Sequence, residues 1–178
     1  MRILSQQACK EWLRVCLGKD SALENLREDY VFRVEYQLPI DIGSKTAIAR
    51  VLAQCLADVQ KPGLFLITGW GIFPSCENMS LFDGYRKSLG ESRPLHAAPG
   101  HVFADSDLRE MECLLDLALY FFWDASLLDE AGTFVVTISH DEFIAINTKN
   151  EDVLRQFQSR CAGPGGLGSP SVGCGART

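Results

Sequence analysis

The sequence lacks the patterns that mark several large classes of protein. None of its apolar runs approaches the roughly 18 residues that a membrane-spanning helix needs. The segment MRILSQQACKEWLRVC becomes polar after its first four residues, so we expect no secretory signal. Basic residues number 17 against 23 acidic ones, for a net charge of -6. This balance argues against a nucleic-acid-binding protein, because such proteins usually present a basic face.

Motifs that carry chemistry through a fixed spacing are also missing. The sequence contains no GxGxxG, HExxH or GxSxG. The segment GSKT at 43–46 opens a predicted helix, but a phosphate-binding loop needs glycine directly before the lysine, and serine stands there. His96 and His101 frame HAAPGH, whose spacing matches no known zinc site. We therefore expect neither a nucleotide nor a metal cofactor.

Cysteine is present, but not in the spacing of a disulfide framework. The seven cysteines are odd in number, and no two of them form a CxxC pair. Four lie within helical apolar patterns, where cysteine behaves as a small hydrophobic residue: Cys9, Cys16, Cys55 and Cys113. The sequence therefore predicts a reduced protein of the cytoplasm.

Hydrophobic periodicity predicts helices that alternate with strands. Helical spacing is found over residues 5–17, 21–28, 44–59, 81–89, 105–122 and 151–158. Strands are predicted over 30–38, 64–68, 101–104, 133–139 and 143–147. The pattern predicts an α/β (α+β) sandwich, with a mixed sheet of four or five strands flanked by helices. We expect a single domain over residues 1–160 and a flexible, glycine-rich tail over 161–178.

Acidic residues are concentrated in one part of the chain. Residues 91–152 hold 13 acidic and 3 basic side chains, a net charge of -10, whereas residues 1–90 have a net charge of +1. One interpretation is a solvated acidic face. The other is a surface that captures a basic protein, such as a toxin. Complementary charges on two proteins speed their encounter and fix their relative orientation. The candidate partner-binding residues are Asp105, Asp107, Glu110, Glu112, Asp116, Asp141 and Glu142.

The polar segment Ser139–Glu142 lies between two predicted strands. In one interpretation it is a hairpin turn whose side chains bond to nearby backbone groups. In the other, His140 is a general base or a ligand that Asp141 orients, with His101 and Cys76 as further candidates. This second interpretation predicts a small hydrolase or a metal-dependent enzyme.

A set of dispersed residues points to a family. Its members are Trp70, Pro74, Ser75, Glu77, Asn78, Leu81, Phe82, Arg86, Ala98–His101, Phe103, Trp123, Asp124 and Ser139–Glu142. The set resembles small bacterial domains that occur beside polymorphic toxins as immunity proteins, and it covers about residues 30–150. The resemblance implies a cytoplasmic binding protein that neutralises a partner, and not an enzyme. It implies no particular binding residues.

Overall fold

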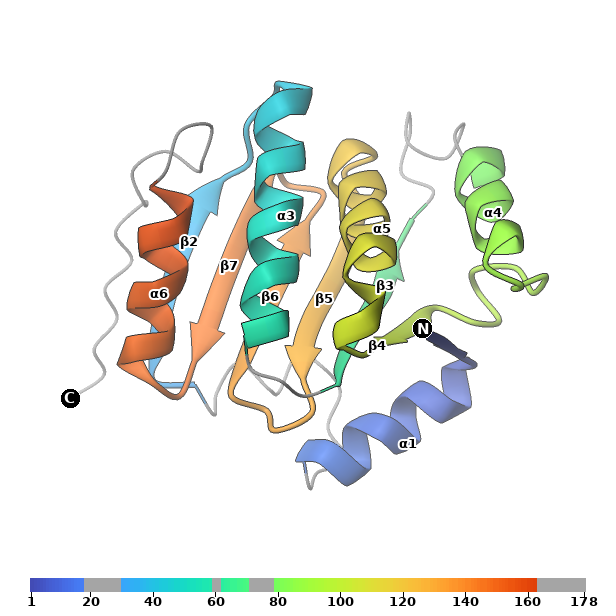
Figure 1. Ribbon diagram of the computed structural model, residues 1–178, viewed down its shortest axis with the longest axis horizontal. Coiled ribbons are helices and arrows are strands. Elements are labelled where there is room, and N and C mark those ends of the chain that lie inside the picture. Colours follow the sequence, from blue (N-terminus) through green and yellow to red (C-terminus); the bar gives the residue numbers. More distant parts are fainter. Residues whose placement is uncertain (18–29, 59–61, 71–78, 163–178) are drawn as a thin grey trace.

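A computed structural model describes residues 1–17, 30–58, 62–70 and 79–162. At its centre is a seven-stranded sheet with the strand order β1-β4-β3-β5-β6-β7-β2 (Figure 1). The strands are β1 (Arg2–Leu4), β2 (Phe32–Gln37), β3 (Gly63–Gly69), β4 (Gly100–Phe103), β5 (Asp124–Asp129), β6 (Phe134–Ser139) and β7 (Phe143–Thr148). The helices are α1 (Gln6–Leu17), α3 (Ile42–Asp58), α4 (Met79–Ser88), α5 (Leu108–Tyr120) and α6 (Glu151–Cys161). Within the described ranges, no helix has the length and apolarity needed to cross a bilayer.

The protein is α+β, as the sequence predicts, but the predicted sheet is wrong in two respects. It has seven strands instead of four or five, and every neighbouring pair is antiparallel, so the sheet is not mixed. The strands that the prediction lacks are β1, which is only three residues long, and β5. The sequence of β5, DASLLD, begins four residues after α5 ends, so its apolar residues look like a continuation of the helix. The predicted helix over 21–28 and the tail beyond residue 162 lie outside the described residues.

A row of helices covers one face of the sheet. In Figure 1, α6, α3 and α5 lie side by side across the strands, and α4 lies beyond α5. Alternate residues of β6 (Phe134, Val136 and Ile138) are fully buried in the core under this layer, as the period of two in a strand requires.

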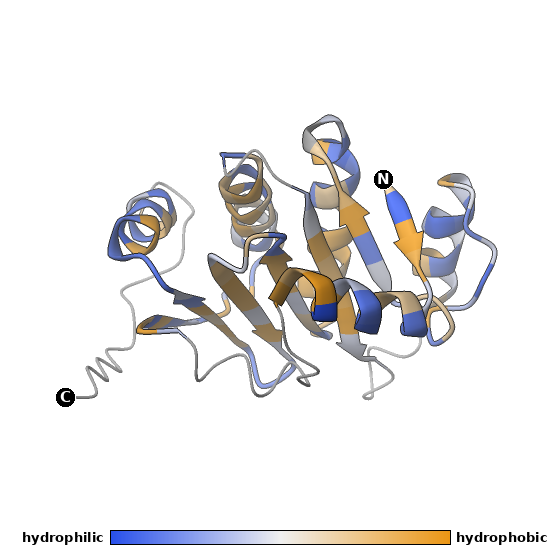
Figure 2. Cartoon of the chain, turned by 90° about the horizontal axis from the view of Figure 1, so that it is seen from below, coloured by the Kyte–Doolittle hydropathy of each residue, from blue (hydrophilic) through white to orange (hydrophobic). Residues whose placement is uncertain are grey.

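Figure 2 shows mainly hydrophilic residues on α6, whose buried side chains are Leu154, Phe157 and Cys161. Each large apolar side chain buried in this way stabilises the fold by about 1.5–3 kcal/mol.

The helix α1 packs on the opposite face of the sheet. It joins a second buried cluster, formed by Leu4, Cys9, Trp12, Leu13, Leu64, Leu66, Val102, Leu128 and Val135. Gly100 of β4 permits this close packing, because a Cβ atom at that position would overlap the sulfur of Cys9.

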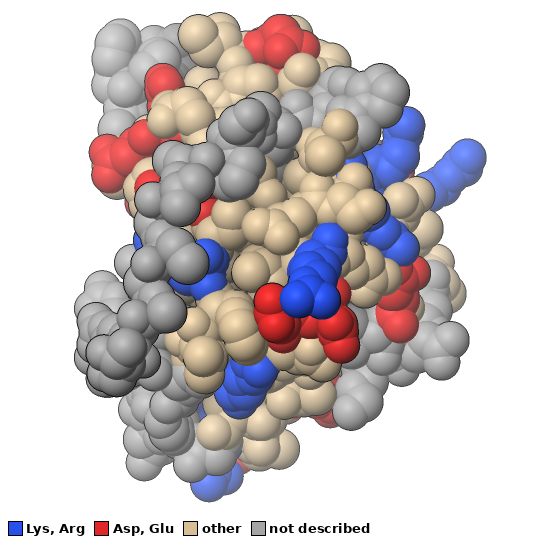
Figure 3. Space-filling view, turned by 90° about the vertical axis from the view of Figure 1, so that its left-hand side faces the viewer, with Lys and Arg blue, Asp and Glu red and all other residues tan. Residues whose placement is uncertain are grey.

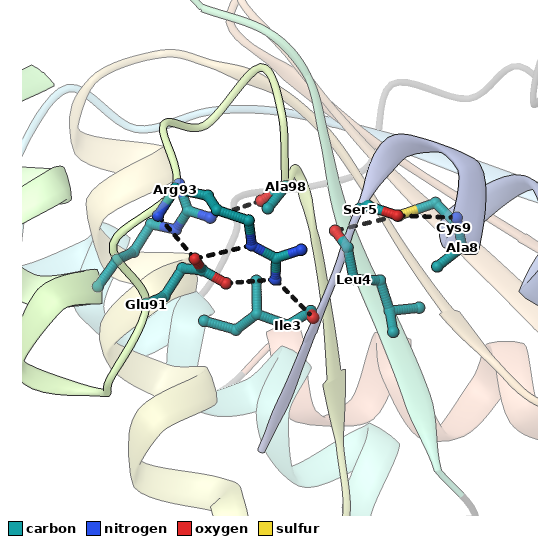
Figure 4. Close-up of polar contacts among 9 residues, drawn as sticks. Ile3, Leu4, Ser5, Ala8, Cys9, Glu91, Arg93 and Ala98 are labelled. Carbon is teal, nitrogen blue, oxygen red and sulfur yellow. Dashed lines mark hydrogen bonds and ion pairs between the residues drawn. The ribbon is translucent and has the colours of Figure 1, made fainter.

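Polar contacts attach β1 and the start of α1 to the rest of the molecule (Figure 4). The guanidinium of Arg93 donates a hydrogen bond to the carbonyl oxygen of Ile3 at 3.2 Å. The same group forms an ion pair with Glu91 at 2.5 Å. The hydroxyl of Ser5 accepts from the backbone N–H of Ala8 and so caps the first turn of α1.

The packing at Gly100 predicts opposite effects for two glycine substitutions. We expect Gly100→Ala to lower the free energy of unfolding by about 1–3 kcal/mol, because the methyl group would overpack the contact between α1 and β4. Gly84→Ala is the control: it lies on the exposed side of α4, where a Cβ meets no atom within 4 Å. There alanine should raise the free energy of unfolding by about 0.5–1 kcal/mol. Urea denaturation measures the free energy of unfolding of both variants. If Gly100→Ala is as stable as the wild type, the close packing of α1 against β4 is contradicted.

Candidate functional site

The acidic residues nominated by the sequence are spread from the start of α5 to the turn near its C-terminal end. Asp107 directly precedes α5, and Glu110, Glu112 and Asp116 lie along that helix, whereas Asp141 and Glu142 lie in the turn between β6 and β7. The 13 residues of α5 span about 20 Å. Its C-terminal end is the one near the turn, because Asp124, which follows α5, contacts His140. The six residues whose side chains are described therefore extend over the length of α5 and the adjacent turn; the side chain of Asp105 lies outside the described part.

Two of these carboxylates are engaged inside the protein. Asp107 forms an ion pair with the N-terminal ammonium at 2.6 Å and accepts from the backbone N–H of Ala104 at 2.9 Å. Asp116 accepts from the hydroxyl of Thr46 at 3.0 and 3.2 Å, which ties α5 to α3. Glu110 and Glu112 are partly exposed and form no hydrogen bond or ion pair with other described residues. They are therefore the acidic side chains of α5 best placed to meet a partner.

An apolar groove lies between α3, α4 and α5. It has a volume of about 320 Å³ and is lined by Ile42, Leu81, Tyr85, Cys113, Asp116, Leu117 and Tyr120. Three of these side chains are large, hydrophobic and exposed: Ile42 (61%), Leu81 (58%) and Tyr120 (48%). Exposed apolar side chains gathered around one groove make it a candidate binding site. We call these seven residues the helix groove.

Helical spacing explains how the walls of the helix groove form. Cys113, Leu117 and Tyr120 are at positions i, i+4 and i+7 of α5 and so share one face of that helix. Leu81 and Tyr85 are at positions i and i+4 of α4, and their side chains form the opposite wall. The single charged lining residue is Asp116. The sequence shows each stripe but not that the two stripes face one another, so the groove could not be found from periodicity alone.

The cysteines differ in exposure along the chain. Cys9 and Cys55 are buried, and burial raises the pKa of these thiols to about 11 and about 12. Cys113 lies in the same kind of helical apolar pattern, but its side chain is exposed in the helix groove. The pKa of Tyr85 is raised, mainly because the hydroxyl is buried and to a smaller extent because Cys113 and the charge of Glu110 are close to it. Glu110 therefore lies near the groove although it does not line it.

The turn between β6 and β7 is the hairpin turn of the first interpretation. The backbone N–H of Asp141 donates to the hydroxyl of Ser139 at 3.2 Å, and the backbone N–H of His140 donates to Asp124 at 2.9 Å. The imidazole Nδ1 of His140 also lies 2.9 Å from both carboxylate oxygens of Asp124. Since a carboxylate only accepts, Nδ1 carries the hydrogen. Gly69, which pairs with Asp124 across β3 and β5, leaves the room that this carboxylate occupies.

The residues of the enzyme hypothesis are not brought together. His101 is fully buried on β4, whereas His140 is exposed in its turn. Phe65 pairs with His101, and Gly69, four residues further along β3, pairs with Asp124 beside His140. At about 3.3 Å per residue, these two backbone positions are about 13 Å apart along β3. Cys76 lies outside the described residues, so the structure leaves His140 with Asp124 and Asp141.

A buried polar cluster lies beneath α4. Arg86 is fully buried, and its Nη2 donates to the carbonyl oxygen of Ala98 at 2.5 Å, whereas its Nε and Nη1 have no hydrogen-bond partner among the described residues. His101 is enclosed by aromatic rings, with Phe65, Phe82 and Phe103 centred 6.1–6.5 Å away. Burial and the charge of Arg86 lower the pKa of His101 to about 3. His101 is therefore a neutral core residue and not a ligand or a general base.

Lys45 is a buried cation near the C-terminal end of α5. Its ammonium lies 3.4 Å from the ring centroid of Phe122, and burial lowers the pKa of Lys45. Phe122 has a φ of 53° and Glu142 a φ of 64°, both in the left-handed region that residues other than glycine rarely adopt. The cation–π contact and the charge of Glu142 both favour the lysine cation. These three residues hold the end of α5 against the β6–β7 turn.

The side of the molecule formed by α6 differs from the helix groove. Figure 3 shows basic and acidic side chains interspersed on this side. Several of them are paired: Arg155 with Glu151 at 2.8 Å, and Arg160 with Asp58. Paired charges at a surface attract a partner weakly, because each charge is already compensated. This side is therefore a poorer candidate for partner binding.

Comparison of the chain with protein-family models, with curated proteins and with solved structures gave no match. Among the described residues, no group of three or more histidine, cysteine, aspartate and glutamate side chains is placed to hold a metal ion.

The pair of His140 and Asp124 predicts a pKa above the usual 6.5 for this imidazole. The hydrogen bond and the charge of Asp124 are the largest causes. We expect Asp124→Asn to lower the pKa of His140 and Asp141→Asn to lower it less, because Asp141 lies 3.5 Å from Nε2 and is mostly exposed. An NMR titration of the imidazole signals measures both effects. The stabilisation by this pair is complete below pH 6.5 and is lost as the pH rises through the raised pKa. An unshifted pKa in the wild type would show that the pair does not persist in solution.

The burial of His101 predicts the opposite dependence on pH. Its pKa is lower in the folded state, so stability should decrease as the pH falls from 6.5 towards 3, by up to about 1.4 kcal/mol per pH unit. His101→Phe removes the titrating group and keeps an aromatic ring among Phe65, Phe82 and Phe103, so it should flatten the dependence between pH 6.5 and 4.5. His96→Asn, at an exposed histidine, is the control. Urea denaturation at several pH values gives the slopes, and equal slopes for His101→Phe and wild type would refute the assignment.

Proposed function

We propose that this protein is a protein-binding module that captures a basic partner protein through the helix groove and the acidic residues of α5 beside it. The observation that carries the proposal is the exposure of Ile42, Leu81 and Tyr120 around one apolar groove. A rim of exposed hydrophobic side chains costs solubility, and a partner that covers it recovers the free energy of apolar burial.

The charge beside the groove favours a basic partner. Glu110 and Glu112 lie on α5 without an ion-pair partner among the described residues, and Asp116 is part of the groove lining. Asp141 and Glu142 add exposed negative charge near the C-terminal end of the same helix. Complementary charge at the rim of an interface mainly speeds association and fixes orientation. Apolar contacts in the groove would supply most of the affinity.

The chemistry of such an interface suits an immunity-type inhibitor of the cytoplasm. A protein of this kind neutralises a toxin by covering a functional surface, and toxins that act on nucleic acids have basic surfaces of the required sign. The buried thiols of Cys9 and Cys55, with their raised pKa values, suit a reducing compartment. The fold needs no chemistry of its own for this function, since covering the partner is sufficient.

Affinity capture with groove variants tests the proposal. We expect the wild-type protein to retain a basic protein from a bacterial lysate at about 50 mM salt and to retain less at about 500 mM salt. Leu81→Ala and Tyr120→Ala should weaken capture about tenfold or more, because each removes exposed apolar contact surface from the groove. Val15→Ala is the matched control, since Val15 is 67% exposed on α1. Glu110→Gln with Glu112→Gln should reduce the dependence on salt.

Capture that is equally strong for the wild type and for Leu81→Ala would contradict the groove as the binding surface. A protein retained equally at both salt concentrations would contradict the role of charge.

A further inference from the structure

We propose that the helix groove is a pocket for one arginine side chain of the partner protein, with Asp116 as the acceptor of its guanidinium. The inference rests on the proposed function and specifies the chemical group that the groove recognises.

The lining of the groove matches the two parts of an arginine side chain. Leu81, Leu117 and Ile42 offer apolar surface for the aliphatic stem. Long cationic side chains commonly bury such stems against hydrophobic surface and leave the charged head at a polar group. The aromatic rings of Tyr85 and Tyr120 add faces on which a planar guanidinium stacks favourably.

Asp116 is positioned to accept the charged head. Asp116 lines the groove and is partly exposed. The hydroxyl of Thr46 supplies one hydrogen to the two oxygens, at 3.0 and 3.2 Å, which fixes the orientation of the carboxylate. The hydroxyl of Thr46 lies between the two oxygens, so the outer lone pairs of the carboxylate are the ones that a guanidinium N–H can reach. Glu110, near Tyr85, adds a second negative charge.

The volume of the groove is sufficient for one long side chain. About 320 Å³ is at the lower end of the range for small-molecule sites, roughly 300–1,000 Å³. Phosphate groups of nucleic acids or of anionic lipids would be repelled by Asp116 and Glu110. Lysine carries the same charge, but the planar guanidinium of arginine also stacks on aromatic rings such as those of Tyr85 and Tyr120. The geometry therefore favours arginine.

Titration with short blocked peptides tests the pocket directly. The probes are Ac-Ala-Arg-Leu-NH₂ and Ac-Ala-Cit-Leu-NH₂, in which citrulline keeps the shape of arginine without its charge. We expect the arginine peptide to shift the methyl NMR signals of Ile42, Leu81 and Leu117 and to bind about fivefold or more tightly than the citrulline peptide. Asp116→Asn keeps the shape of the side chain and an acceptor for Thr46, so it should remove the difference between the peptides. Glu151→Gln, at an exposed carboxylate of α6, is the control and should preserve it.

Two results would overturn the pocket: equal binding of the two peptides to the wild type, or a preference for arginine that Asp116→Asn leaves unchanged. The protein-capture experiment separates this failure from that of the proposed function. If Leu81→Ala abolishes protein capture while the peptides bind equally, the binding module stands and the arginine pocket fails. If the arginine peptide binds through Asp116 while the groove variants capture protein as well as the wild type does, the pocket stands and the proposed function fails.

Discussion

The packing of α3 and α5 side by side on the sheet is the constraint on which the rest of the structure depends. Both helices bury their inner faces in one core, where Ala49 and Ala53 of α3 lie in the same cluster as the leucines of α5. Small residues of this kind let neighbouring helices approach closely. The hydrogen bond from Thr46 to Asp116 fixes the two helices on the solvent side. Since α5 leads directly into the central strand β5, its position also sets Tyr120 at the groove and Asp124 beside His140.

The sequence predicts most of the elements, because their periodicities are strong. The strands near 64–68, 133–139 and 143–147 and the long helix near 105–122 are all found, with ends shifted by a few residues. The strand order and the antiparallel pairing could not be predicted, because they depend on contacts between residues far apart in the chain. The sequence does not predict β1 and β5, and the reasons are local. The strand β1 is too short to show a pattern, and β5 follows an apolar helix without a clear break.

The candidate site is less accessible to prediction than the fold, because exposure is a property of the assembled helices. Leu81 belongs to the apolar stripe of its helix, yet α4 buries only Phe82 and Arg86, so Leu81 remains at the surface. Two buried donors of Arg86 have no hydrogen-bond partner in the described part of the chain, and a buried donor left unpaired costs about 1–3 kcal/mol. Of the described helices, α4 has the fewest buried side chains, so the wall of the helix groove that it forms is held by fewer core contacts than the wall formed by α5.

The open sheet has two edges, and each of them is protected against association with another sheet. At one end of the strand order, β1 offers only three residues for further backbone pairing. At the other end, β2 carries Arg33 and Glu35, whose side chains form an ion pair at 2.7 Å. Short edge strands and charged side chains are devices by which natural proteins prevent aggregation through edge-to-edge pairing. The protein can thus expose a hydrophobic groove on its helices without offering its strands as a template for fibril growth.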